Sequence, residues 1–311
     1  MHLNKLIIIL TIQEKSLFVL ILILMTISFP IGLYLILNYD SSNTVIFTHE
    51  LEFSLNLPIF GSKIIKTNLG YSFVSLWCIL LALFVIAFLN SKNKMFDFKN
   101  TDPNMLHSVI QWFVILVVLS GIINFVQEQI GMQQNYPNFN TLINFFDVTK
   151  ASIVEELGFR VVLIGMTIYL LYSRKIIGYS FLQILYCPSN ITNKIKKTHY
   201  GSLIITSGIF FGLLHVLFGE LWGADKLAQA TISGIILGWA YFKHGIIVSI
   251  LIHWSINYFV FTYIFLISYM TKQKIAEAIF HPAVGFLETI FIIIGIVSMI
   301  TLITRYVNKK L

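Results

Sequence analysis

The chain has 311 residues, of which 57% are hydrophobic and only 11% are charged. Soluble domains carry about 25% charged residues, so this composition excludes an ordinary soluble protein and indicates a multi-pass integral membrane protein surrounded by a lipid bilayer. The formal net charge of +7 does not indicate a nucleic-acid partner, because the basic residues cluster in short segments between apolar runs, as topology determinants do. Cys78 and Cys187 form neither a disulfide framework nor a CxxC metal motif, and free thiols are expected.

Apolar runs of about 20 residues, the length of a membrane-spanning helix, recur along the chain. The first follows Lys5 and Lys15, contains Pro30 and lacks a clear cleavage site, so it is expected to be a retained span and not a signal peptide. Together the runs predict an all-α membrane protein, a polytopic helical bundle of about eight transmembrane helices: Ser16–Leu37, Tyr71–Leu89, Leu106–Val126, Ala151–Tyr172, Gly201–Phe218, Ala228–Phe242, Ile246–Met270 and Val284–Tyr306.

The segments between the predicted spans indicate how the chain is oriented in the membrane, but this orientation separates Glu155 from His253. Asn138–Lys150 is interpreted as a short interfacial helix ahead of the fourth span. The excess of Lys and Arg in alternate connections puts both termini on the cytoplasmic side. That orientation places Glu155 at the outer end of its span and His253 about eight residues from the inner end of another. A helix tilt, a bend near Gly245 or the opposite orientation is then needed to bring the two side chains together.

Charged or imidazole side chains inside the apolar runs fall in three short motifs: Glu155–Arg160, Phe211–His215 and His253–Asn257. A charge at membrane depth costs roughly 2.5–3.5 kcal/mol, and such residues usually mark a functional site. On a helix, Glu156 and Arg160 share a face and can neutralise each other. Glu155 is rotated by about 100° and stays available as a general base or acid. The alternative is that the motif is only an ionic clamp between helices.

The other two motifs supply imidazole and amide groups. His215 ends an apolar run in which Gly208 and Gly212 are one turn apart, a spacing that allows close approach of helices. His253 and Asn257 share a helical face, which suits them to stabilise an oxyanion. Taken singly, a histidine at a helix end such as His215 is more often an interface residue than a ligand, whereas the His253–Asn257 pair is equally explained as an interhelical hydrogen bond.

Together these residues form a hydrolytic set. Glu155 and His215 can activate water, while His253 and Asn257 can stabilise a tetrahedral intermediate. The same carboxylate and two imidazoles could instead hold Zn²⁺, whose catalytic sites use three protein ligands and a water. The HExxH signature is absent, so zinc stays open as a cofactor and the sequence requires none.

In this order, and inside apolar helices, Glu-Glu-x-x-x-Arg, Phe-x-x-x-His and His-x-x-x-Asn resemble the CPBP intramembrane proteases. These are the CAAX-processing and bacteriocin-processing proteins, which include the prenyl-protein (Ras-converting) endoprotease. The resemblance covers about Ala151–Tyr263 and extends to the glycine-rich stretch Gly234–Gly238. One departure is Val161, which stands where family members often have glycine; it is expected to alter helix packing and not the chemistry.

The resemblance implies a membrane-embedded endopeptidase with a catalytic set of six residues: Glu155, Glu156, Arg160, His215, His253 and Asn257. In that set Glu155 activates water with help from His215, and His253 with Asn257 forms an oxyanion site. Glu156 and Arg160 support it. Three parts follow: residues 1–135 hold three N-terminal membrane spans, 136–270 the CPBP-like catalytic membrane core, and 271–311 the C-terminal span with a short basic tail.

The predicted function is hydrolysis of peptide bonds near the membrane surface, either CAAX-type processing or maturation of a peptide precursor. The partner is then a protein or peptide substrate that is lipidated or membrane-anchored, and the location is the cell membrane if the source is prokaryotic. Two alternatives come from other classes. One is a non-catalytic scaffold or immunity protein of the same fold, and the other is a proton-coupled transporter that uses the carboxylates and histidines as a relay.

Overall fold

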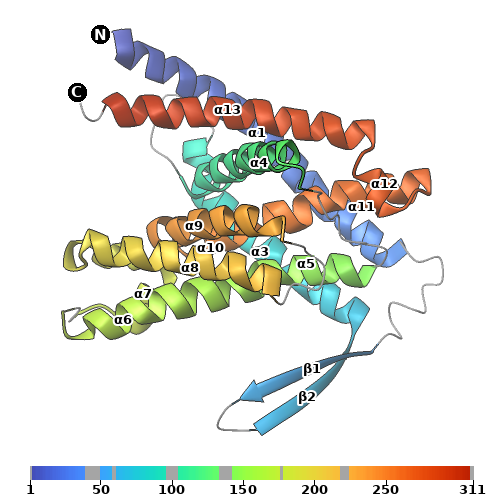
Figure 1. The fold of residues 1–311 in the computed structure, drawn as a ribbon, viewed down its shortest axis with the longest axis horizontal. Coiled ribbons are helices and arrows are strands. Elements are labelled where there is room, and N and C mark those ends of the chain that lie inside the picture. The colour runs from blue at the N-terminus through green and yellow to red at the C-terminus, as the bar shows by residue number, and fades with distance from the viewer. Residues whose placement is uncertain are drawn as a thin grey trace.

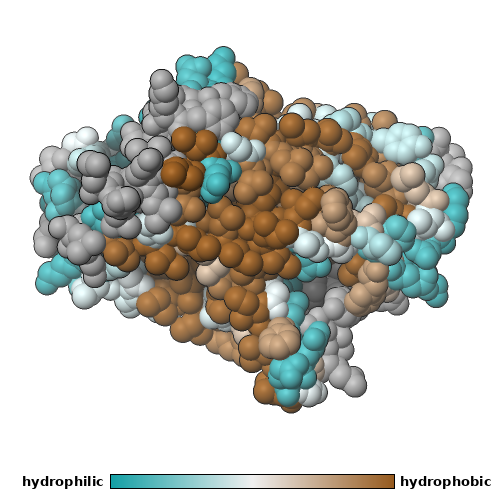
Figure 2. Space-filling model, turned by 90° about the horizontal axis from the view of Figure 1, so that it is seen from above, coloured by the Kyte–Doolittle hydropathy of each residue, from teal (hydrophilic) through white to brown (hydrophobic). Residues whose placement is uncertain are grey.

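A computed structural model describes residues 2–38, 50–57, 61–95, 104–132, 142–175, 178–217 and 224–308. Its helices pack side by side in one bundle, and the labelled chain ends lie close together at one end of it (Figure 1). Hydrophobic side chains form a broad central band between hydrophilic ends (Figure 2). This distribution matches a bundle whose middle lies in hydrocarbon and whose ends reach water, and it confirms the predicted helical membrane protein.

Four long helices lie outside the motif-bearing part of the chain: α1 (His2–Asn38), α3 (Leu69–Met95), α4 (Met105–Gln129) and α13 (Pro282–Asn308). Helix α4 packs against each of the other three, and its residues from Leu106 to Leu116 are mostly buried. Apart from two π-helical segments, the described residues of the remaining part form five longer helices and five short ones: α5 (Leu142–Glu155), α6 (Thr167–Tyr172), α7 (Phe181–Tyr186), α8 (Lys197–Leu217), α9 (Lys226–His244), α10 (Ile246–Trp254), α11 (Val260–Thr271), α12 (Ile275–Ala278) and 3-10 turns at Ser173–Lys175 and Pro188–Lys194.

Within the described residues, six helical stretches are long and apolar enough to cross a membrane: Ile9–Asn38, Leu69–Met95, Met105–Gln129, Lys197–Leu217, Ile246–Thr271 and Pro282–Asn308. Each coincides with a predicted span. The other two predicted spans, Ala151–Tyr172 and Ala228–Phe242, are helical but fall outside this set, so the count of eight is not confirmed.

The segment Asn138–Lys150 is not a separate short helix where the structure describes it, and its first four residues lie outside the described range. Helix α5 continues without a break through a π-helical segment, Glu156–Met166, into α6. The whole stretch from Leu142 to Tyr172 is therefore one helix, and Glu155 lies near its middle. The interfacial position of its beginning stays a prediction.

A second π-helical segment, Ser255–Phe259, joins α10 to α11 directly after His253. A π-helical turn is wider than an α-helical turn and is often found at functional sites, because it changes the face on which neighbouring residues lie. Both π-helical segments adjoin motif residues: the first begins at Glu156, and the second contains Asn257.

One feature departs from the predicted all-α architecture. The chain between α1 and α3 forms a two-stranded antiparallel hairpin, β1 (Glu50–Leu57) with β2 (Gly61–Asn68), in which Glu50 pairs with Asn68. The hairpin projects from the bundle (Figure 1). The two strands are outside the segments that carry the motifs.

Glycines set the distance between α8 and α9. A Cβ added at Gly208 would lie 2.7 Å from the Ile235 backbone nitrogen, and one at Gly234 would lie 2.9 Å from the Gly208 Cα. Only residues without a side chain permit this approach. As a result, the end of α8 that carries His215 is held against α9.

Stacked aromatic rings hold α10 and the π-helical segment after it against α1 and α5. The Trp254 ring stacks on Phe29 of α1, with centroids 5.1 Å apart, and on Tyr258 at 5.7 Å. Tyr258 in turn stacks on Phe145 of α5 at 5.5 Å. Trp254 and Tyr258 are fully buried. Because His253 precedes Trp254, this packing limits rotation of α10 and fixes the direction in which the His253 ring points.

Candidate active site

The three motifs converge on one point. The Glu155 Oε2 atom lies 3.8 Å from His253 Nε2 and 4.0 Å from His215 Nε2. The two histidines come from α10 and α8, and the carboxylate comes from the last residue of α5. Residues separated by as many as about a hundred positions in the sequence are thus within reach of a single water molecule.

Glu156 and Arg160 form the pair that their spacing predicts. Glu156 Oε2 lies 3.2 Å from Arg160 Nε, and neither side chain is exposed. The guanidinium lies 4.6 Å from the centre of the Phe211 ring, in a cation–π arrangement, and Arg160 Nη2 donates to the Gly234 carbonyl at 3.5 Å. Arg160 therefore links the first motif to both α8 and α9.

Glu156 also holds the third motif in place. Its Oε1 atom lies 2.9 Å from His253 Nδ1, and its Oε2 atom accepts a short hydrogen bond from the Ser249 hydroxyl. Ser249, His253 and Asn257 are four residues apart in turn, so α10 and the π-helical segment that continues it present all three toward the same region. Since Glu156 is bound by Arg160, Ser249 and His253 at once, it is a fixed anion with no free face toward a substrate.

The partners of His253 determine which ring nitrogen carries the proton. The Asn257 side-chain nitrogen lies 2.9 Å from the Val148 carbonyl and 3.1 Å from His253 Nε2. An amide nitrogen can only donate, so His253 Nε2 must accept, and His253 Nδ1 then donates to Glu156. In this arrangement both Asn257 amide protons and the His253 ring proton are already used.

Glu155 and His215 differ from that fixed network. His215 Nδ1 lies 2.9 Å from the Phe211 carbonyl, which can only accept, so its Nε2 presents a lone pair toward Glu155. Glu155 Oε2 is buried, yet it has no hydrogen-bond partner among the described residues. Buried carboxylate oxygens are rarely left without a partner, and a water bound between Glu155 and the two imidazoles would supply one.

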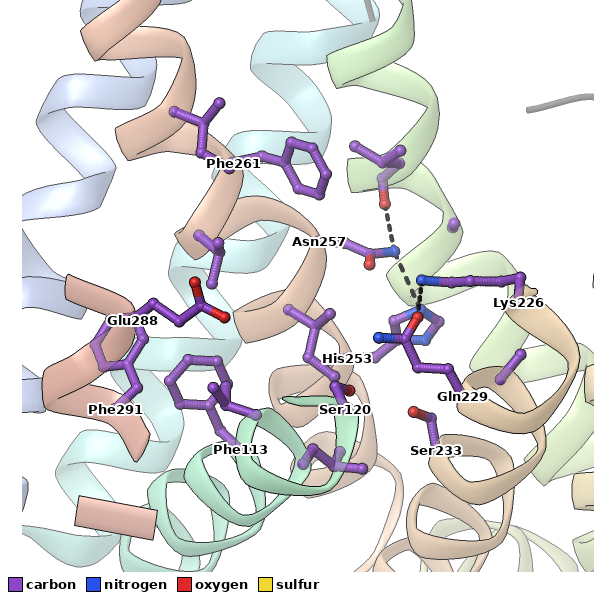
Figure 3. Close-up of a pocket in the computed structure, with 18 of the residues that line it drawn as sticks. Phe113, Ser120, Lys226, Gln229, Ser233, His253, Asn257, Phe261, Glu288 and Phe291 are labelled. Carbon is purple, nitrogen blue, oxygen red and sulfur yellow. Dashed lines mark hydrogen bonds between the residues drawn. The ribbon is translucent and has the colours of Figure 1, made fainter. Parts of the chain in front are cut away.

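These side chains open onto a cavity of about 470 Å³ (Figure 3). One wall is apolar and includes Phe113 of α4 and Phe291 of α13. Another is formed by α9, from which Lys226, Gln229 and Ser233 project. The cavity is therefore bordered by helices from inside and outside the motif-bearing segment.

The donor set does not fit a catalytic zinc ion. A ligating imidazole must offer a nitrogen lone pair, and both His253 nitrogens are occupied by Glu156 and Asn257. Only Glu155 and His215 remain, one ligand fewer than catalytic zinc sites use. Across the part of the chain that the structure describes, no group of three His, Cys, Asp or Glu residues is placed to hold a metal ion.

Several contributors to the site did not emerge from the sequence. The sequence pattern could have pointed to Ser249, because it is a polar residue four positions before His253 in an apolar run. Lys226 resembled an ordinary topology-determining base in a loop. Val148 acts through its backbone carbonyl, and no sequence pattern reports that.

The fold and the site define a helical membrane protein in which a carboxylate and two imidazoles face a cavity. A comparison with known protein families gives a match for part of the chain. Residues 137–259 match the family described as Rce1-like, type II CAAX prenyl endopeptidase. The match spans all three motifs and confirms the predicted resemblance of this part of the chain to the CAAX proteases. Comparisons with curated proteins and with solved structures give no significant match.

Proposed function

We propose that this protein is a CAAX-type intramembrane endopeptidase that hydrolyses a peptide bond with a water activated by Glu155 and His215. The observation that carries the proposal is the buried Glu155 Oε2 atom. It has no hydrogen-bond partner among the described residues, and two imidazole nitrogens lie within 4.0 Å of it. A carboxylate in this position can accept a proton from water, as a general base must.

The reaction follows from the roles of these groups. Glu155 takes a proton from the water while the lone pair of His215 Nε2 orients it, and the water oxygen bonds to the carbonyl carbon of the scissile peptide. The carbonyl π electrons move onto oxygen and form a tetrahedral oxyanion. When this intermediate collapses, the carbon–nitrogen bond breaks and Glu155 returns its proton to the leaving amine. No covalent enzyme intermediate forms.

The adjacent residues have supporting roles in this proposal. Arg160 neutralises Glu156, and Glu156 together with Ser249 fixes the His253 ring. His253 and Asn257 border the side of the cavity where the oxyanion forms. Residues 136–270 act as the catalytic core, and the segments 1–135 and 271–311 complete the bundle around it. The substrate is a lipidated or membrane-anchored protein or peptide, which reaches the cavity from the surrounding membrane.

The test is cleavage of a fluorogenic prenylated CAAX peptide by the purified full-length protein and by Glu155→Gln. The amide is nearly isosteric with the carboxylate but accepts no proton, so turnover should fall by at least the ~10²–10⁴-fold that general bases contribute. The thermal unfolding midpoint should stay unchanged, since no described residue donates a hydrogen bond to Glu155 Oε2. A Glu155→Gln protein that cleaves at the wild-type rate would refute the assignment.

A further inference from the structure

One carboxylate in the cavity has neither a cation beside it nor a role in the proposed reaction. The carboxylates that line the cavity belong to Asp147, Glu155, Asp225 and Glu288. Asp147 accepts a hydrogen bond of 2.7 Å from the Lys150 ammonium group, and Asp225 attracts the ammonium group of the adjacent Lys226. Glu155 is the proposed base. The Glu288 side chain forms no ion pair or hydrogen bond with any residue that the structure describes.

Glu288 lies in a helix that is otherwise almost free of charge. Helix α13 is long and apolar enough to cross a membrane, and its only charged residues are Glu288 and Arg305. Arg305 lies 3.8 Å from Glu14. An ionisable residue within such a helix usually faces a cavity and marks a substrate pathway. Glu288 has this position, because its side chain extends from α13 into the cavity (Figure 3).

Aromatic packing holds this turn of α13 beside the third motif. Phe291 packs on Phe259 and Phe113, with ring centroids 5.6 and 5.3 Å apart. Phe259 follows Asn257 by two residues in the same π-helical segment. Residues three apart on a helix share a face, so Glu288 is on the same side of α13 as Phe291. The Glu288 carboxylate is therefore fixed in the cavity that also contains the motif residues.

The surroundings of Glu288 suit a lysine or arginine side chain. The apolar wall at Phe113 and Phe291 strengthens the attraction of a carboxylate for a cation, compared with the same pair in water. The same wall can pack against the apolar stem of a long basic side chain while its charged end reaches the carboxylate. Calcium needs about six to eight oxygen ligands, which a single carboxylate does not supply, so the geometry favours an organic cation.

We infer that Glu288 is a specificity-determining residue, whose carboxylate binds a lysine or arginine side chain of the substrate close to the scissile bond. The inference rests on the proposed peptidase function and narrows its substrates to peptides with a basic residue near the cleaved bond. Glu288 neither gives nor takes a proton in the reaction, so the proposed steps are unchanged.

The kinetic test varies peptide and protein together. In the fluorogenic prenylated CAAX peptide, lysine or glutamine is placed in turn at each position flanking the cleaved bond, except the prenylated cysteine. A hydrogen bond between charged groups contributes about 10–100-fold to binding. Wild type should therefore prefer lysine by about this factor in kcat/KM at one position at least. Glu288→Gln should lose the preference through KM, with kcat nearly unchanged.

Two further variants complete the comparison. Glu277→Gln is the matched control, because Glu277 is exposed on the neighbouring helix α12 and is not among the residues that line the cavity. This variant should keep the preference for lysine. Glu288→Lys should prefer glutamate at the same position. Because its preference should reverse and not simply vanish, Glu288→Lys decides the question if Glu288→Gln unfolds at a lower temperature than wild type.

The inference is overturned if wild type shows no preference for lysine at any position, or if the preference persists in Glu288→Gln. An equal loss of kcat for every peptide in Glu288→Gln would also overturn it, since Glu288 would then act on the reaction and not on specificity. Binding of the same peptides in the Glu155→Gln background does not depend on turnover. If wild type cleaves none of them but Glu288 still makes the lysine peptides bind more tightly, the proposed function fails and the role of Glu288 stands. Equal binding of all peptides would refute the role of Glu288.

Discussion

Removal of Arg160 tests whether the buried ion pair stabilises the site. In Arg160→Met, Glu156 would keep Ser249 and His253 as partners but would have no cation beside it, although its side chain is entirely buried. Breaking a buried pair by removing one partner costs about 3–5 kcal/mol. Since whole domains are stable by only about 5–15 kcal/mol, Arg160→Met should lower both the amount of folded protein and its resistance to unfolding.

A double variant separates stability from function. Replacing a whole buried ion pair by apolar residues of similar size is often neutral or even stabilising, so Glu156→Leu with Arg160→Met should recover most of the lost stability. Activity should not return, because His253 Nδ1 would then have no acceptor and the ring could turn. Stability without activity in the double variant is the result that the contacts of Glu156 predict.

The assay is equilibrium unfolding of the purified protein in mixed detergent micelles, with thermal unfolding as a second measure. Arg174→Met is the matched control, because Arg174 is exposed at the end of the same long helix, and surface substitutions usually change stability by no more than about 0.5 kcal/mol. The reasoning fails if Arg160→Met is as stable as Arg174→Met. It also fails if the double variant is less stable than Arg160→Met alone.

Three more predictions concern other parts of the molecule. Chelation with dipicolinate should leave the cleavage rate unchanged, because both His253 nitrogens are engaged by Glu156 and Asn257; activity lost to the chelator and restored by zinc would contradict this. Gly212→Leu should abolish activity and lower the unfolding temperature, since an added Cβ would lie 3.0 Å from the Leu227 carbonyl of α9, whereas Gly201→Leu, with nothing within 4 Å, should do neither. Arg305→Met should destabilise the protein, because the fully buried Glu14 would lose the cation that lies 3.8 Å away; unchanged thermal unfolding would show that this pair adds nothing.

The sequence predicted which side chains meet better than it predicted where they lie along their helices. Residue spacing alone predicted the pairing of Glu156 with Arg160, because four residues make one helical turn, and the ion pair is present. Membrane-depth charges on three helices predicted convergence, and the three motifs do meet. Both inferences follow from strong physical constraints, namely helical periodicity and the cost of an isolated charge in lipid.

The position of Glu155 along its helix could not be predicted in the same way. The hydropathy pattern changes at Lys150, where Asp147 and Lys150 form a half-buried ion pair, and such a change is typical of a membrane boundary. The helix nevertheless continues from Leu142 to Tyr172, because the apolar side chains of Phe145 and Val148 are buried against other helices. Tertiary packing overrides the local pattern here, and a sequence window does not contain its packing partners.

The π-helical segments are a second property that spacing does not report. Glu156 and Arg160 pair across the first of them, and Asn257 lies in the second. A wider turn places an extra residue between the two ends of a segment, so faces assigned from a period of 3.6 shift along it. The His253–Asn257 contact is present all the same, and the contact of Asn257 with the Val148 carbonyl involves a backbone atom of another helix, which spacing does not report.

The two adjacent glutamates show how one dipeptide supports two roles. Glu156 is bound by a guanidinium, a hydroxyl and an imidazole, so its charge is fixed and it orients His253. Glu155 has an oxygen with no such partner and faces the cavity. The motif residues come from within the matched segment, whereas the apolar cavity wall at Phe113 and Phe291 comes from α4 and α13, outside it. Since the walls of a cavity select what enters it, we expect the helices outside the matched segment to restrict which substrates fit in the proposed reaction.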